Sequence, residues 1–108
     1  IAGFADLRKA VSDKFKNENG LEYAPDQIVV STGAKQSIAN VVLSLVNPGE
    51  EVIVPTPYWV SYSQMIKLAE GIPVFVDATV ETDYKVSAKQ IRDAITPKSK
   101  LLIFVSKF

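Results

Sequence analysis

The apolar positions of the chain alternate between helical spacing and short continuous runs. Apolar residues three or four positions apart among polar ones predict amphipathic helices over residues 2–18, 34–46, 60–69 and 87–95. Short apolar runs that stop at turn residues predict strands near residues 28–31, 51–54, 73–77 and 101–105. Strands that are apolar throughout and alternate with helices are typical of right-handed crossovers onto a parallel sheet. The pattern therefore predicts an α/β fold, a three-layer, mostly parallel sheet with flanking helices.

Local signals sharpen several of these boundaries. Asn19-Gly20 is a typical C-terminal stop for the first helix, and Ser87 is a good N-cap for the last one. The polar stretch from Thr79 to Tyr84 is expected to be an exposed loop. No repeat or linker interrupts the chain, so we expect residues 1–108 to form a single α/β segment.

Composition excludes several classes of function. The 108 residues are 47% hydrophobic and 22% charged, which is typical of a globular domain rather than a disordered chain. Twelve basic residues balance twelve acidic ones, so nothing favours a nucleic acid or an anionic membrane as a partner. No apolar run approaches the roughly 20 residues of a membrane span. We therefore expect no nucleic-acid or membrane partner.

The absence of cysteine and histidine narrows the chemistry further. It excludes disulfides, Cys/His metal sites, thiol nucleophiles and histidine-based acid–base steps, so no metal site is expected. A chain without cysteine is compatible with the cytoplasm, which is the location we expect. The chain opens on Ile1 rather than Met, so we expect it to be processed or to be a piece of a longer protein.

Candidate chemistry follows the ends of the predicted strands, where ligands bind in open α/β sheets. After the first strand, residues 31–37 read Ser-Thr-Gly-Ala-Lys-Gln-Ser, and Gly33 falls where a helix begins. A glycine lets the backbone approach a ligand closely, and a helix N-terminus offers N–H groups and partial positive charge to an anion. The segment therefore predicts a phosphate cradle, although it matches neither a P-loop nor a dinucleotide fingerprint. The alternative is a plain strand-to-helix turn capped by Thr32.

Aromatic residues follow the second strand. Residues 55–62 read Pro-Thr-Pro-Tyr-Trp-Val-Ser-Tyr and contain Trp59, the only tryptophan of the chain. A flat ring at this place either stacks on a planar heterocycle or fills a gap in the core. Taken with the phosphate cradle, the first reading describes a pocket for a phosphorylated aromatic cofactor.

These segments carry a resemblance to a known family. Gly3 to Arg8 in the pattern G-x-x-x-L-R, residues 31–36, residues 47–52 and residues 57–62 resemble motifs of fold-type I pyridoxal-phosphate-dependent aminotransferases, in the correct order. The aspartate aminotransferase branch is the most similar. The resemblance covers essentially the whole chain and implies that residues 1–108 are the N-terminal half of the large, cofactor-binding domain.

The resemblance also implies roles for individual residues. The backbone of Gly33, Ala34 and Lys35 would bind the phosphate of pyridoxal 5'-phosphate, and Trp59 would stack on its pyridine ring. The family's Schiff-base Lys, its Asp on the pyridine nitrogen and its substrate-binding Arg have no matching position, so no catalytic residue is expected here. Lys107 departs from the Ser-Pro-x-Asn-Pro-x-Gly segment expected at this point and is taken as a solvated lysine rather than the Schiff-base residue.

Two hypotheses of different classes follow. In the first, the chain is a segment of an aspartate aminotransferase-like enzyme that acts on amino acids and 2-oxo acids, is inactive alone, and forms the homodimer that the resemblance implies. In the second, it is a stand-alone, flavodoxin-like module that binds a phosphorylated ligand without catalysis. Continuation of the reading frame into N-P-x-G and a later lysine would favour the first.

Overall fold

The computed structural model describes residues 1–105, which fall into two compact units that divide between Ser37 and Ile38. The predicted role of Lys107 lies outside the described residues. Each unit is compact through its own internal contacts.

The first unit is a helix with a connecting segment folded against it. Helix α1 covers Ala5–Asn19 and ends at Gly20, whose φ of 66° places it in the left-handed region and whose N–H donates to the Phe15 carbonyl. The predicted helix and its stop are confirmed, although the helix begins three residues later than expected. A 3-10 helix, Pro25–Gln27, follows, and the Arg8 guanidinium donates to the Pro25 carbonyl at 3.1 Å.

The prediction of a strand near residues 28–31 is wrong. Ile28 is extended and buried, and the Val30 N–H donates to the Ala2 carbonyl at 2.9 Å. Val29, however, is 66% exposed, and the segment forms no strand ladder with any described residue. A β-branched run favours extended backbone, but it becomes a strand only where a neighbouring strand pairs along its length.

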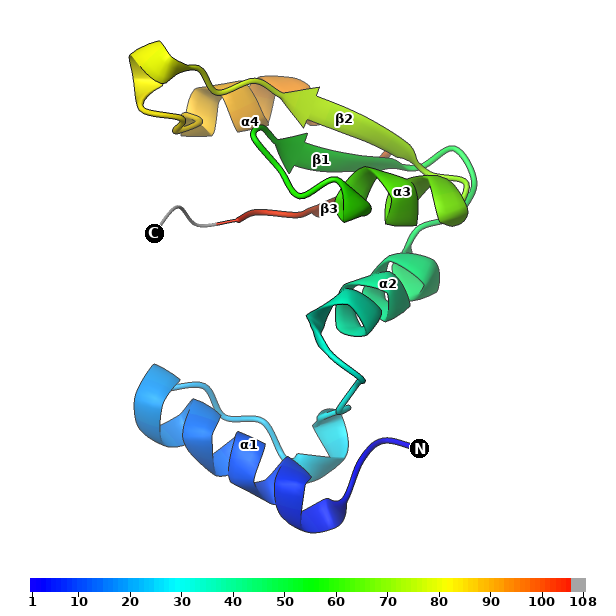
Figure 1. Ribbon diagram of the computed structural model, residues 1–108, viewed down its shortest axis with the longest axis vertical. Helices are drawn as coiled ribbons and strands as arrows, with labels where there is room; N and C mark the ends of the chain where they lie inside the picture. The colour runs from blue at the N-terminus through cyan, green and yellow to red at the C-terminus, as the bar shows by residue number, and fades with distance from the viewer. Residues whose placement is uncertain (106–108) are drawn as a thin grey trace. The chain divides into compact units, whose positions relative to one another are not determined.

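The second unit contains the sheet. Within residues 1–105 the structure has three strands, β1 (Glu51–Pro55), β2 (Ile72–Val76) and β3 (Ser99–Leu102). They lie in the order β2-β1-β3, and both pairings are parallel (Figure 1). Three predicted strands and their parallel arrangement are thus confirmed. The last one ends at Leu102 rather than at residue 105, and the Ile103 N–H donates to Ile53 just beyond it.

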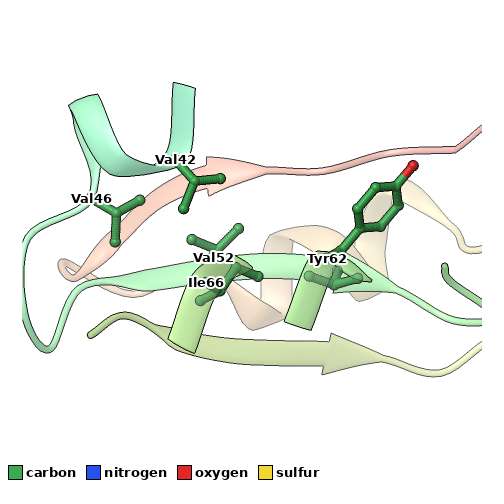
Figure 2. Packing of buried hydrophobic residues seen from close by; sticks show 6 residues of the cluster. Val42, Val46, Val52, Tyr62 and Ile66 are labelled. Atoms are coloured by element: carbon green, nitrogen blue, oxygen red, sulfur yellow. The ribbon is translucent and has the colours of Figure 1, made fainter. Parts of the chain in front are cut away.

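Helices cover the sheet. Helix α2 covers Ala34–Leu45, α3 covers Ser61–Leu68 and α4 covers Ala88–Ala94, close to the predicted ranges. A hydrophobic cluster of buried residues lies between the helices and the sheet. Helix α2 and the residue after it supply Val42 and Val46, β1 supplies Val52 and Val54, and α3 supplies Tyr62 and Ile66. Figure 2 shows Val42 and Val46 pointing toward Val52 of the strand.

The alternation along β1 explains the three layers. Val52 and Val54 face the hydrophobic cluster, so Ile53 between them points to the opposite face, where it is also buried. Helix α4 packs against β2 and begins at Ser87, whose hydroxyl accepts the Gln90 N–H as predicted. The α/β fold with a parallel sheet between helices is confirmed.

Residues 79–84, which lie between β2 and α4, are exposed, as predicted. They contain a short 3-10 helix, Val80–Thr82, followed by Asp83 and Tyr84 with positive φ. Among the described residues no helix combines the length and apolar character needed to cross a membrane.

Candidate functional site

The turn that leads into α2 is the segment for which the sequence predicts a phosphate cradle. Gly33 has a φ of +84°, a conformation that side-chain-bearing residues rarely adopt. Its N–H donates to the Ser31 carbonyl at 2.9 Å, which closes the turn, and its own carbonyl accepts the Ser37 N–H at 3.2 Å. On the other side of the turn, the Thr32 N–H donates to Oε1 of Gln36. The helix therefore starts directly at Ala34.

The space in front of this turn is open within the described part of the chain. Beyond its chain neighbours, no described atom lies within 4 Å of the point that a Cβ on Gly33 would occupy. Ala34 and Lys35 are exposed, and they form the opening turn of a helix, where backbone N–H groups and the helix dipole favour an anion. The segment 33–35 thus fits a phosphate group.

Trp59 lies in the loop between β1 and α3 and is 45% exposed. Its indole meets the ring of Tyr62 edge to face, with centroids 5.7 Å apart and planes at 86°. The neighbouring Tyr58 stacks instead on Phe75, at 5.0 Å and 20°. Trp59 is therefore half-exposed and packs against Tyr62, whereas Tyr58 packs against Phe75.

A polar network that the sequence analysis did not single out ties the ends of two strands together. The Thr56 hydroxyl donates to Oδ1 of Asp77 at 3.2 Å, and it accepts the Ala78 N–H at 3.3 Å. Gln90 of α4 donates to the Asp77 carbonyl at 2.9 Å. The sequence could have pointed to Thr56 and Asp77 as candidate site residues, because each is a polar residue that directly follows an apolar strand.

A small pocket of about 260 Å³ lies beside this network, and its lining includes Pro55, Thr56, Pro57, Lys85 and Phe104. It belongs entirely to the second unit. Within residues 1–105 no group of three or more acidic side chains is placed to hold a metal ion.

The structure places the predicted site residues in both units. Gly33, Ala34 and Lys35 are contiguous at the start of α2 in the first unit, and Trp59 belongs to the second. Their assignment to a cofactor stays a prediction.

Comparison with known proteins gives a consistent result. The sequence model of the family described as aminotransferase class I and II matches residues 1–108. An aspartate/prephenate aminotransferase of Nitrosomonas europaea is 48% identical over 95% of this chain and 26% of its own length. A bifunctional aspartate aminotransferase and glutamate/aspartate-prephenate aminotransferase of Petunia hybrida is 50% identical over 97% of this chain and 22% of its own length.

Solved structures agree with the sequence comparison. The aspartate aminotransferase of Rhizobium meliloti has a TM-score of 0.90 and 41% identity over 94% of this chain and 26% of that one. The structure of the Thermus thermophilus aspartate aminotransferase with maleate has a TM-score of 0.90 and 42% identity, over 94% of this chain and 26% of that one. The chain spans about a quarter of the length of the curated relatives it matches. On these matches, this chain belongs to the aminotransferase class I and II family.

Proposed function

We propose that this chain is part of a pyridoxal-phosphate-dependent aminotransferase of the aspartate type, which moves an amino group between an amino acid and a 2-oxo acid. The observation that carries the proposal is the match of the family along all of residues 1–108. The chain would be the N-terminal half of the large, cofactor-binding domain.

In this proposal, the turn before α2 would bind the phosphate group of the cofactor. The backbone of Gly33, Ala34 and Lys35 would donate to the phosphate oxygens, which explains why a glycine with φ of +84° precedes the helix. A phosphate held by backbone groups and a helix dipole needs no buried counter-charge. The exposed Lys35 side chain adds positive charge on the same turn.

Trp59 would orient the cofactor by stacking on its ring. A bound pyridoxal ring supplies an electron-withdrawing system that stabilises negative charge at the substrate's α-carbon. Trp59 would fix the plane of that ring and exclude water from one of its faces, and its 45% exposure leaves room for the contact. We assign no proton transfer and no catalytic role to any residue of this chain.

The comparisons favour a dicarboxylic substrate. The relatives are named for aspartate, glutamate and prephenate, and the Thermus enzyme was solved with maleate, a four-carbon dicarboxylate. We therefore propose aspartate as an amino donor and a 2-oxo acid as acceptor. A homodimer and a cytoplasmic location complete the proposal, and sedimentation and cell fractionation would test them.

The test is amino transfer by the complete encoded protein. The protein is freed of cofactor, reloaded with pyridoxal phosphate, and assayed with aspartate and 2-oxoglutarate, with prephenate as a second acceptor. We expect turnover that depends on the added cofactor. Phosphate binding without any amino transfer would favour the alternative, a phosphate-ligand-binding module without catalysis.

A further inference from the structure

Trp59 sits on an exposed loop, yet its proposed task requires a fixed ring plane. A tryptophan side chain turns about two bonds, and a mobile ring would lose conformational entropy on stacking against a ligand. A contact that holds the indole in one plane before the ligand arrives would reduce that entropy cost.

Tyr62 is placed to do this. Its ring meets the indole of Trp59 edge to face at 5.7 Å and 86°, which lies within the favourable range for aromatic pairs. Its backbone N–H donates to the Trp59 carbonyl at 2.9 Å, so both the main chain and the ring of Trp59 are held from the same residue.

Tyr62 is itself anchored. Only 9% of it is exposed, and it belongs to the hydrophobic cluster with Val42, Val52 and Ile66. Figure 2 shows it in that cluster, on the same helix as Ile66. A rigid core therefore supports Tyr62, and Tyr62 in turn supports the half-exposed Trp59.

From this chain of contacts we infer that Tyr62 is a positioning residue, which fixes the plane of the Trp59 ring in readiness for a planar, aromatic cofactor. The inference rests on the proposed function and deepens it. Tyr62 acts through Trp59, because its ring edge contacts the indole and its body is buried. The Tyr62 hydroxyl takes part in neither of these two contacts, so the ring alone should suffice.

The experiment uses the complete encoded protein with Tyr62→Phe, Tyr62→Leu and Tyr62→Met. Phe75→Leu is the matched control, because it removes the Tyr58–Phe75 stack instead of the Trp59–Tyr62 pair. The first readout is the near-UV circular dichroism of Trp59 without cofactor, taken as the difference from Trp59→Phe in each background. The second is the Kd for pyridoxal phosphate, and far-UV circular dichroism confirms folding.

We expect Tyr62→Phe and Phe75→Leu to keep the Trp59 signal and the Kd. In Tyr62→Leu and Tyr62→Met the Trp59 signal should be largely lost, and the Kd should rise about three- to tenfold, the range for an aromatic pair. If folded leucine and methionine variants keep both the signal and the Kd, Tyr62 does not position Trp59. If the unsubstituted protein binds no pyridoxal phosphate, the proposed function fails, and the inference about a cofactor fails with it.

Discussion

Gly33 and Gly3 both have positive φ, but the chain needs them for different reasons. A Cβ on Gly33 would have no described atom within 4 Å beyond its chain neighbours, so only the backbone conformation favours glycine there. A Cβ on Gly3 would come within 2.8 Å of the Val30 Cβ, so that glycine allows two segments of the first unit to touch. The G-x-x-x-L-R pattern is thus structural at Gly3, and Arg8 adds its bond to Pro25.

Gly33→Val should weaken phosphate and pyridoxal phosphate binding by tenfold or more. The valine strains a backbone at φ of +84° and puts a branched side chain in front of the opening turn of α2. Titration followed by absorbance measures the effect. Gly49→Val is the matched control, since Gly49 has φ of +80° and equally open surroundings in the second unit. Equal phosphate affinity in the two variants would contradict the cradle assignment.

The roles of single residues could be predicted where a local sequence motif marks the residue. They could not be predicted where the role depends on a contact between residues far apart in the sequence. The sequence pattern placed Gly33 at the start of a helix and Trp59 in a loop, and the structure agrees with both positions, although the strand predicted before Gly33 is absent. The link from Thr56 to Asp77 joins residues 21 positions apart, so no local pattern could show it. The same holds for the packing of Gly3 on Val30.

At the level of helices and strands, local chemistry explains the helices better than the strands. Gly20 ends α1 and Ser87 begins α4, because caps satisfy backbone groups within a few residues. Strands depend on neighbours, which is why residues 28–31 form no strand although Ile28 is extended. Similarly, β3 ends at Leu102, the last residue in register with β1, although the apolar run continues to Val105.

Ser87→Ala should lower the free energy of unfolding by about 1 kcal/mol, the usual cost of losing an N-cap. The hydroxyl of Ser87 accepts the Gln90 N–H, and the Gln90 side chain in turn accepts the Ser87 N–H at 2.9 Å. Urea unfolding measures the change. Ser44→Ala, an exposed serine within α2, should change stability by less than about 0.5 kcal/mol. Equal losses in both variants would show that the cap does not stabilise α4.

At the scale of the whole molecule, the second unit is held by its hydrophobic cluster. Ile66 is fully buried between the helices and β1, whereas Leu68 on the same helix is 69% exposed. Ile66→Ala should therefore cost about 2–5 kcal/mol of unfolding free energy through a cavity and lost transfer energy. Leu68→Ala should cost less than about 1 kcal/mol. Urea midpoints that rank the two variants in the opposite order would contradict this packing.

Residues 1–108 expressed alone should transfer no amino group from aspartate to 2-oxoglutarate. Lysine attacks an aldehyde only as the free amine, which burial or a neighbouring cation favours. Every lysine among residues 1–105 is exposed, so none of them is enclosed in a buried site where a cofactor aldehyde could be held. Borohydride reduction in the presence of pyridoxal phosphate, followed by peptide mapping, should find no stoichiometrically labelled lysine. Full labelling of Lys107 together with turnover would contradict the prediction.

The most direct test of the central claim is an experimental structure of the complete encoded protein with pyridoxal phosphate bound. We predict phosphate oxygens within about 2.7–3.2 Å of the backbone nitrogens at the opening turn of α2, beside Gly33. We predict the pyridine ring stacked against Trp59. A phosphate bound elsewhere, or a cofactor ring that does not contact Trp59, would contradict the account.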